Sequence, residues 1–468
     1  MTGSLGPPTL AELDAVGIAE AVRSRRLTAR DAVEAALGRI AARDDALNSF
    51  TAVLADAARR EAAAVDTRVA RGEDPGLLAG VPFAVKNLFD VKGLTTLAGS
   101  RIHAERPPAA RDAAAVAALR RAGAVLVGTL NMDEYAFGFT TENSHYGATR
   151  NPHDRERVAG GSSGGSGAAV GAGMVPLALG SDTNGSIRVP AALCGVFGLK
   201  PTYGRVSRAG TALFAGSFDH VGPLSRSARD LAAAFDALQG PDAADPVASR
   251  RPPEPSRREL ARGIAGIRFA VADGHFARGG EPGALAAVRT VADSLGARGV
   301  VTIPEAHRAR AAAMIITSAE GAQLHLADLR TRPDAFDPLT RDRFLAGALI
   351  PAAAYVAAQR FRAWYRARVA AVFDGIDVIL APTTPYPAPR IGQERITVAG
   401  VEVPMRSTLG LYTQPLSFIG LPVITVPLAR RSGLPLGVQL VGAPFRESFL
   451  LRAAHYLEAA GVVAAPIA

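Results

Sequence analysis

The lysines of this 468-residue chain are the first residues whose chemistry stands out, because there are only three of them. Lysine and arginine together number 52, and all but Lys86, Lys92 and Lys200 are arginine. Arginine stays protonated in proteins, whereas a lysine can lose its proton when burial lowers its pKa. Each remaining lysine therefore marks a position where a neutral amine could be needed, although chance retention explains Lys92 equally well.

Two segments of small residues carry serines that could act as nucleophiles, and the first, residues 160–167, reads GGSSGGSG. A flexible linker would be solvated, yet apolar residues flank this run. The run also lacks the Gly-Lys-Ser/Thr of a phosphate-binding loop and the glycine spacing of a dinucleotide-binding fold. Small residues here instead let the backbone pass close to a reacting centre while Ser162, Ser163 or Ser166 presents a hydroxyl.

The second segment, residues 180–190, reads GSDTNGSIRVP and places Ser186 behind small residues. Such a turn can direct several backbone N–H groups at one point, as an oxyanion requires. A serine nucleophile also needs a base. Histidine is the usual choice, and sequence distance does not exclude the nearest ones, His145, His153 and His220. The alternative is a lysine made neutral by burial, and Lys86 suits that role because it ends the apolar run VPFAVK.

Apolar runs predict the elements that must position these residues. Residues 81–86 and 124–128 read as buried strands and flank a predicted helix over 112–122. Strands without polar alternation belong to a sheet that is covered on both faces, which indicates an α/β architecture. Further strands are predicted over 267–272, 378–381, 423–427 and 436–441, and further helices over 10–22, over 29–40 with Thr28 as N-cap, and between residues 308 and 373.

The stretch 240–258 is the best candidate for a linker, because it is rich in proline, arginine and aspartate and has no periodicity. It could separate two domains, but the strands on both sides could equally join one sheet, which we favour. We therefore expect N-terminal helices in 1–75 that pack on the core or on a partner, a core in 76–239, a linker or surface excursion in 240–262, and a C-terminal part in 263–468 that completes the same sheet and the substrate pocket.

Composition argues against several classes of protein. The formal net charge is +9, yet the basic residues are spread along the chain without the aromatic-interleaved runs of a nucleic-acid surface. Residues 158–181 are uncharged, but their glycines and serines make a poor membrane helix. The start shows no secretory signal pattern, and the single cysteine, Cys194, fits a reducing cytoplasm. We expect a cytoplasmic, globular protein that binds neither nucleic acid nor membrane.

Taken together, these segments resemble the amidase signature family of serine amidohydrolases. The resemblance rests on the lysine near the end of GVPFAVKN, the run GGSSGGSG and the segment GSDTNGSIRVP. The 24 positions from Ser162 to Ser186 also match the family's separation of its two catalytic serines. The likeness runs over 80–238 and returns in 381–385 and 420–442, so it covers most of the chain. It implies the family's fold, a large mixed central β-sheet covered by helices on both faces.

The resemblance implies a role for each residue of these motifs. Ser186 would be the acylated nucleophile, Ser162 a bridging serine held by a strained cis peptide, and Lys86 the neutral base. Many family members have glycine where this chain has Asn184, which leaves the backbone donors intact and places a side chain near the pocket. Neither a metal ion nor another cofactor is expected. The oxyanion hole would comprise the N–H groups of Thr183, Asn184, Gly185 and Ser186.

Finer features point to a substrate class within the family. Residues 131–154 and 411–423, with Asn184, are most similar to members that release ammonia from a small carboxylated urea and work with a small accessory subunit. We therefore expect a small amide substrate and a homo- or hetero-oligomer. The alternatives are the amidase subunit of a glutamine-dependent tRNA amidotransferase, which shares NMDE, TEN and KPTYGRVSR-like segments, and a broad-specificity amidase. A catalytically silent binding module is disfavoured because all three catalytic residue types are present.

Three residues are candidates for holding the non-reacting part of the substrate. A small anion needs a cation, and Arg188 lies two residues past the nucleophile, although it could instead belong to a structural ion pair. Tyr135 and Phe137 could wall the pocket or be core aromatics. Asp182 and Asp219 could orient the nucleophile turn, or serve as helix caps or solvent-facing groups.

Overall fold

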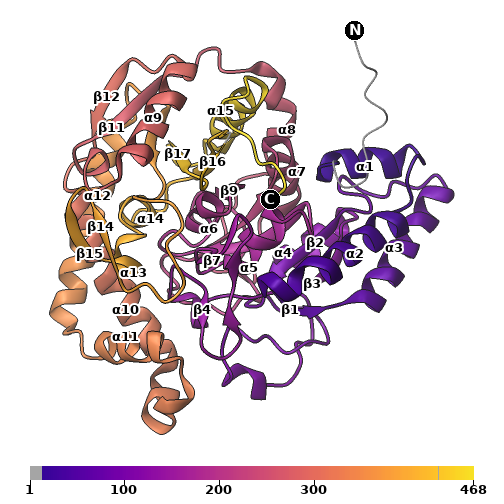
Figure 1. The fold of residues 1–468 in the computed structure, drawn as a ribbon, viewed down its shortest axis with the longest axis horizontal. Helices are drawn as coiled ribbons and strands as arrows, with labels where there is room; N and C mark the ends of the chain where they lie inside the picture. The colour runs from indigo at the N-terminus through magenta and orange to yellow at the C-terminus, as the bar shows by residue number, and fades with distance from the viewer. Residues whose placement is uncertain (1–12, 431) are drawn as a thin grey trace.

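The computed structural model describes residues 13–430 and 432–468, and these form one large mixed β-sheet with helices around it (Figure 1). The sheet has parallel pairs near both edges and antiparallel pairs in the middle. This confirms the expected α/β class with a large mixed sheet. Its eleven strands pair in the order β1 (Phe50–Val53), β3 (Val125–Leu130), β2 (Pro82–Lys86), β8 (Leu177–Asp182), β10 (His220–Ser225), β9 (Phe197–Lys200), β16 (Val423–Pro427), β17 (Gly437–Gly442), β13 (Val378–Pro382), β11 (Phe269–Asp273) and β12 (Gly299–Thr302).

Both faces of the sheet are covered. Every residue of β2, β3, β8, β10 and β17 is buried, so the side chains on either face are shielded from water. The continuously apolar runs of the sequence reflect this double coverage. The helices that pack on these strands are α2 (Ala29–Leu47), α3 (Ala55–Ala70), α4 (Ala114–Arg121), α5 (Gly164–Gly171), α6 (Arg188–Leu193), α7 (Ala228–Leu238), α9 (Pro282–Leu295) and α15 (Glu447–Ala459).

Helices α11 (Pro338–Ala348) and α12 (Ala352–Val372) both pack on the long helix α10 (Ala306–Thr331) at one side of the molecule (Figure 1, orange). Among the described residues, no single helix is both long and apolar enough to cross a bilayer; α11 and α12, which meet at 94°, pass that test of length and composition only as a pair. The remaining elements are α1 (Ala15–Arg23), α8 (Ser256–Glu259), α13 (Met405–Thr408), α14 (Gln414–Ser417), the 3₁₀ helices η1 (His103–Glu105), η2 (Glu134–Ala136), η3 (Leu260–Arg262), η4 (Gly274–Ala277) and η5 (Pro333–Ala335), and the short strands β4 (Glu142–Asn143), β5 (Gly147–Ala148), β6 (Arg150–Asn151), β7 (Asp154–Val158), β14 (Arg395–Val398) and β15 (Val401–Pro404).

The predicted N-cap of α2 is present. Thr28 accepts a hydrogen bond from the N–H of Asp31, whose carboxylate accepts one from the N–H of Thr28, so the two residues form a capping box. The helix continues to Leu47, beyond the predicted end at residue 40. The helix predicted over 10–22 corresponds to α1, while its first residues lie outside the described part of the chain.

Strands β2 and β8 position the candidate catalytic residues of the sequence motifs. They are parallel neighbours, with Val85 opposite Leu179, so their C-terminal ends meet at one edge of the sheet. Lys86 ends β2, and Asp182 ends β8. The glycine- and serine-rich run follows β7, and its second half forms the first turn of α5, whereas the turn with Ser186 lies between β8 and α6. Both serine segments therefore reach the strand ends beside Lys86.

Strands from both sides of segment 240–262 belong to the same sheet, since β10 precedes the segment and β11 follows it. One apolar cluster extends from Ala15, near the start of the described chain, to Val463 near its end. The two halves of the chain therefore share a sheet and a core, while the domain boundaries themselves stay a prediction.

Candidate active site

The side chain of Lys86 lies at the C-terminal end of β2 and is completely buried. Its Nζ donates to Ser162 Oγ at 2.6 Å and to Ser181 Oγ at 2.9 Å. Because β2 is covered on both faces, the strand carries this amine into the interior of the protein. The lysine is thus in direct contact with one of the two serines that the sequence motifs single out.

Burial sets the proton affinity of Lys86. Removal from water disfavours the ammonium form and lowers the pKa of Lys86 from 10.5 to about 7, although Asp133, Asp219 and Asp182 each act in the opposite direction. A substantial fraction of this lysine is therefore neutral near pH 7 and can accept a proton.

Ser162 and Ser186 lie in adjacent segments of backbone. The peptide bond between Gly161 and Ser162 is cis. The N–H of the next residue, Ser163, donates to the carbonyl of Ser186 at 3.2 Å. The fold therefore brings the two serine segments together, with the hydroxyl of Ser162 against Lys86.

The carboxylate of Asp182 holds the turn that carries Ser186. Its Oδ1 accepts from the N–H of Gly185 at 2.7 Å, and its Oδ2 accepts from the N–H of Ile187 at 3.2 Å. Of the four N–H groups expected in an oxyanion hole, that of Gly185 therefore already has an acceptor inside the protein. Those of Thr183, Asn184 and Ser186 belong to residues that line a small hollow in the protein.

A second carboxylate, that of Asp219, braces the start of the same turn. Its Oδ1 accepts from Thr183 Oγ1 at 2.5 Å, and its Oδ2 accepts from the N–H groups of Phe214 and Ala215 at 2.7 and 2.9 Å. Burial raises the pKa of Asp219 to about 6 despite these bonds. Of the roles considered for Asp182 and Asp219, the geometry fits orientation of the nucleophile turn.

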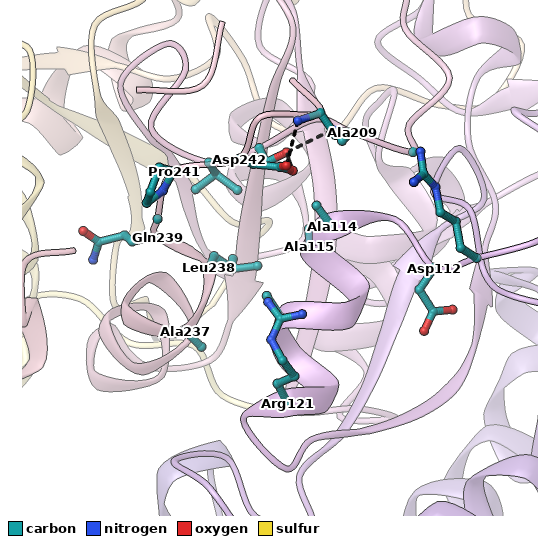
Figure 2. A pocket seen from close by; sticks show the side chains of 17 residues that line it. Asp112, Ala114, Ala115, Arg121, Ala209, Ala237, Leu238, Gln239, Pro241 and Asp242 are labelled. Atoms are coloured by element: carbon teal, nitrogen blue, oxygen red, sulfur yellow. Dashed lines mark hydrogen bonds between the residues drawn. The ribbon is translucent and has the colours of Figure 1, made fainter. Parts of the chain in front are cut away.

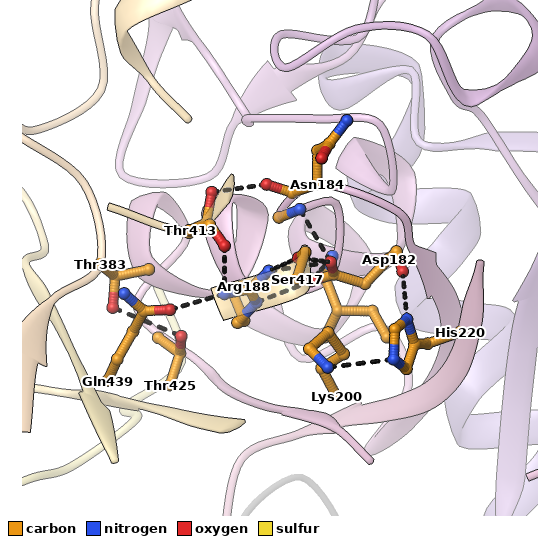
Figure 3. Close-up of polar contacts among 12 residues, drawn as sticks. Asp182, Asn184, Arg188, Lys200, His220, Thr383, Thr413, Ser417, Thr425 and Gln439 are labelled. Atoms are coloured by element: carbon orange, nitrogen blue, oxygen red, sulfur yellow. Dashed lines mark hydrogen bonds and ion pairs between the residues drawn. The ribbon is translucent and has the colours of Figure 1, made fainter. Parts of the chain in front are cut away.

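Arg188 is enclosed by protein and pairs with Asp182 (Figure 3). Its Nε donates to Asp182 Oδ2 at 2.9 Å and its Nη2 to Oδ1 at 3.0 Å. Its Nη1 donates to the carbonyl of Thr413 at 3.1 Å and to Gln439 Oε1 at 2.7 Å. Burial opposes ionisation of Asp182, but the charge and hydrogen bonds of Arg188 hold its pKa well below the usual range. This geometry is that of the structural ion pair considered for Arg188, and it ties the nucleophile turn to the C-terminal half of the chain.

A second buried lysine, Lys200, lies in the same network (Figure 3). Its Nζ donates to the carbonyls of Pro201 and Leu421 and is 3.1 Å from His220 Nε2. His220 Nδ1 is 3.0 Å from the carbonyl of Asp182. Burial is the main cause that lowers the pKa of Lys200 to about 7. These contacts brace the end of β8, where the nucleophile turn begins.

The histidines considered as alternative bases have other partners. His145 Nε2 is 3.2 Å from Glu134 Oε1, and His153 Nε2 is 3.1 Å from the carbonyl of Cys194. His220 is held by Lys200 and by the backbone of β8, as described above. Since Lys86 directly contacts Ser162, the geometry favours lysine as the base.

A cavity of about 590 Å³ lies near the turn that carries Ser186. Beside it, a smaller hollow is lined in part by Thr183, Asn184 and Ser186. Ser186 therefore borders the hollow, whereas no residue of its turn lines the larger cavity. The hollow and the cavity share the lining residues Phe137, Gly138, Phe139, Met314, Arg343 and Gln414.

The two aromatic candidates lie in different places. Phe137 lines the cavity, and the guanidinium of Arg343 lies 3.6 Å from the centre of its ring. Tyr135 is as buried as Phe137, each being 3% exposed, but it lines neither the cavity nor the hollow and lies against His325, with ring centroids 3.8 Å apart. The pocket-wall interpretation therefore fits Phe137, whereas the core interpretation fits Tyr135, which packs among His103, His325, Phe336 and Phe344.

Three residues near the lysine or in the cavity were not singled out by sequence reasoning. Ser181 contacts Lys86, and Asp133 and Arg343 line the cavity. Ser181 lies in the segment GSDTNGSIRVP and Asp133 in NMDE, so a closer inspection of these motifs could have suggested both. Arg343 is one arginine among many in a helix without a motif, and nothing in the sequence distinguishes it.

A second cavity, of about 360 Å³, lies between α4 and α7 (Figure 2). Its lining comes from residues 111–121, 206–210 and 237–244, so it is separate from the serine segments. Asp242 in its wall accepts a hydrogen bond from Ser207 Oγ at 2.6 Å. Within the described part of the chain, no group of three or more His, Cys, Asp or Glu side chains converges as a metal site would require.

The sequence matches a known protein family over most of its length. A family model described as Amidase matches residues 31–451. The chain belongs to the amidase signature family. As a member of the amidase signature family, it is an amidohydrolase that acts on C–N bonds of linear amides.

Individual members of the amidase signature family resemble the chain over nearly its whole length. One relative is the 1-carboxybiuret hydrolase subunit AtzE of Pseudomonas sp. (strain ADP). It is 55% identical to this chain over 449 residues, and the match covers 96% of this chain and 98% of AtzE. A glutamyl-tRNA(Gln) amidotransferase subunit of Anaeromyxobacter sp. (strain K) is 41% identical over 482 residues, and the match covers 96% of each chain. A solved structure, described as an unexpected vestigial protein complex that reveals the evolutionary origins of an s-triazine catabolic enzyme, is 54% identical, with a TM-score of 0.96 over 97% of this chain and 100% of that one.

Proposed function

We propose that the chain hydrolyses its substrate through an acyl-enzyme on Ser186, with Ser162 as the bridging serine and Lys86 as the base. The observation that carries the proposal is the 2.6 Å contact between Lys86 Nζ and Ser162 Oγ in a fully buried setting. A lysine with a pKa of about 7 is matched to proton transfer near neutral pH.

The proposed cycle conserves protons. Lys86 takes a proton from Ser162 as Ser162 takes one from Ser186, and Ser186 Oγ attacks the amide carbonyl. The C–N bond then breaks, and the same relay returns the proton to the departing ammonia. Water uses the relay in turn to hydrolyse the ester of Ser186, which releases the acid and restores the free serine.

We propose that the negative charge on the attacked carbonyl oxygen is held by the N–H groups of Thr183, Asn184 and Ser186. These residues border the hollow next to Ser186, while the N–H of Gly185 is engaged by Asp182. Asp182 would therefore act by shaping the turn, because it aims the other donors at one point before the substrate arrives.

For the substrate, we propose 1-carboxybiuret or a related small carboxylated urea. Support comes from the 55% identity to AtzE of the Pseudomonas 1-carboxybiuret hydrolase and from the cations in the cavity wall. Arg310 donates to Gln414 Oε1 at 2.8 Å, and Arg406 pairs with Glu142 at 2.9 Å. Arg343 lines both the cavity and the hollow beside Ser186, which suits it to bind the carboxylate of a substrate whose amide reaches the serine.

We also propose a cytoplasmic enzyme that works in an oligomer with a small accessory subunit. Support for this partner comes from the relatives, because AtzE is named as one of the subunits of its enzyme, and the similar solved structure is described as a protein complex. The lone, buried cysteine agrees with a reducing compartment.

Ammonia release from 1-carboxybiuret by the purified chain, without ATP, tests the proposed function. We expect this activity to exceed that on glutamine, on malonamide-type amides and on aryl amides. Faster hydrolysis of glutamine, or dependence of the activity on ATP and tRNA, would instead assign the chain to the amidotransferase class.

The catalytic residues can be tested with matched serine variants. Ser186→Ala should abolish both turnover and labelling by a fluorophosphonate probe, and Ser162→Ala should reduce turnover about 10³-fold or more. Ser166→Ala is the control, since Ser166 lies in the same glycine-rich run and its hydroxyl donates only to the carbonyl of Leu179 at 3.0 Å. Equal losses in Ser162→Ala and Ser166→Ala would contradict the relay.

A further inference from the structure

Asp133 is a buried carboxylate next to the proposed relay for which the mechanism above has no use. It lies shortly after β3, and its N–H donates to the carbonyl of Ser162 at 3.3 Å. Its backbone is thus bonded directly to the bridging serine. Since its side chain is 7% exposed, any role of this carboxylate is exerted inside the protein.

The side chain of Asp133 is confined but only partly satisfied. Its Oδ1 accepts from the N–H of Thr141 at 3.0 Å, whereas its Oδ2 has no hydrogen-bond partner among the described residues. A Cβ added to Gly161 would lie 2.1 Å from Oδ2, and one added to Gly138 would lie 2.2 Å from Cγ. The carboxylate therefore fits between two glycines, of which one directly precedes Ser162. Burying a carboxylate with an unpaired oxygen raises the free energy of the folded state, so we expect a compensating positive charge nearby.

Three carboxylates act on Lys86 from different elements, and two of them are already compensated. Asp182 is paired with Arg188, and Asp219 accepts three hydrogen bonds from the chain. Asp133 exerts the largest of the three charge effects on Lys86. Lys86 in turn is the largest cationic influence on Asp133, whose pKa burial raises to about 6. Arg406, Asp337 and Arg343 also interact with Asp133 through their charges. The other charged residues that line the same cavity are Glu134, Arg310 and Glu394.

We propose that Asp133 is a positioning residue that supplies the counter-charge for the ammonium formed on Lys86 during the relay. The inference rests on the proposed function, in which Lys86 receives the proton of Ser162. Asp133 stays ionised, and no proton passes to it. Its negative charge raises the proton affinity of Lys86 just where burial has lowered it, and its backbone bond holds Ser162 against the same amine. The arrangement parallels a base that is oriented by a third group.

Asp133→Asn tests the inference because it removes the charge and keeps the shape. The chain has only three lysines, so protein labelled with ¹³C at lysine Cε gives three signals whose pH titration can be followed directly. We expect the apparent pKa of Lys86 to fall by about one unit in the variant, as for loss of one nearby opposite charge. The acid limb of fluorophosphonate labelling of Ser186 should move to lower pH by the same amount, and the plateau rate should fall about tenfold or more. Asp230→Asn is the matched control, since Asp230 is also completely buried but accepts from the N–H groups of Ala15 and Val16 in α1.

The possible results distinguish a failure of the counter-charge role from a failure of the proposed function. An unchanged Lys86 titration in Asp133→Asn would overturn the counter-charge role, even if turnover fell. A wild-type chain that the probe does not label at any pH would overturn the proposed function instead. If Asp133→Asn does not fold, Gly138→Ala keeps the carboxylate but displaces it, because the added Cβ would lie 2.2 Å from Asp133 Cγ. The pH titration of Lys86 should then differ from that of wild type, and an identical titration would again refute the inference.

Discussion

Replacement of Lys86 by methionine should remove activity and yet stabilise the folded protein at neutral pH. The folded pKa of Lys86 is about 7, while an unfolded lysine titrates near 10.5. Between these values the unfolded chain binds one proton more than the folded chain, so the free energy of unfolding rises with pH by about 1.4 kcal/mol per unit. The stabilising contribution of a neutral Lys86 is therefore complete above pH 10.5 and is lost as the pH falls toward 7. Methionine has a similar length and does not titrate.

The magnitude of this effect follows from the two pKa values. At pH 7.5, wild-type Lys86 costs about 4 kcal/mol of folding free energy relative to high pH. Methionine avoids that cost but loses the hydrogen bonds to Ser162 and Ser181, each worth about 1 kcal/mol. We therefore expect Lys86→Met to be about 2 kcal/mol more stable than wild type at pH 7.5, with the difference vanishing or reversing near pH 9.5.

Urea unfolding followed by circular dichroism at pH 7.5, 8.5 and 9.5, together with ammonia release, measures both effects. The wild-type unfolding free energy should rise across this range by about 2 to 3 kcal/mol more than that of Lys86→Met. Lys92→Met is the control, because Lys92 is exposed and should change neither property. Parallel pH dependences for wild type and Lys86→Met would refute the lowered pKa, and with it the neutral base.

Three further predictions concern the turn and the cavity. Arg188→Met should lower the free energy of unfolding by about 3 to 5 kcal/mol, because it leaves the carboxylate of Asp182 buried without its cation. Thermal unfolding at pH 7 compares the variant with wild type, and a difference within experimental error would contradict the ion-pair role. Gly185→Ala should abolish fluorophosphonate labelling while the circular dichroism spectrum stays native. Gly185 has φ +141°, and an added Cβ would lie 2.3 Å from Thr413 Oγ1, so the turn should be distorted. Normal labelling kinetics would show that the turn tolerates the side chain. Arg343→Gln should raise KM for a carboxylated substrate about tenfold or more and leave that for a neutral amide nearly unchanged, which steady-state ammonia release measures; equal effects on both substrates would argue against carboxylate binding.

The predicted strands differ from the observed ones for a local reason. All six predicted strands match observed ones closely, namely β2, β3, β11, β13, β16 and β17, because apolar residues dominate each segment. Central strands β8 and β10 were not predicted. The first follows the glycine-rich run without a break in pattern, and the second contains Gly222 and Pro223, which disfavour a strand. In the sheet, an added Cβ at Gly222 would lie 2.1 Å from the carbonyl of Leu199, so the residue that weakens the sequence signal is the one that close strand packing requires.

The candidate site likewise contains residues that the sequence alone identifies and residues whose roles only the structure shows. The motifs single out Lys86, Ser162 and Ser186, because small residues around a serine and a lysine at the end of an apolar run are local features. The alternatives for Arg188 and Tyr135 could not be resolved in the same way. An arginine next to a nucleophile turn can bind substrate or a carboxylate, and only the position of Asp182 and Gln439 around Arg188 decides between them.

The amino-acid sequence by itself determined which groups are present and where strands can form: a deprotonatable lysine at the end of a buried strand, two serines in small-residue turns, and an α/β pattern. The tertiary structure decided what those groups can do. Ser162 lies 76 residues from Lys86 and meets it only because β2 and β8 are parallel neighbours. The proton affinity of Lys86, the free oxygen of Asp133 and the enclosure of Arg188 all depend on desolvation and on charges contributed by distant segments. Such effects are fixed by distances through space, which the order of residues along a chain does not contain.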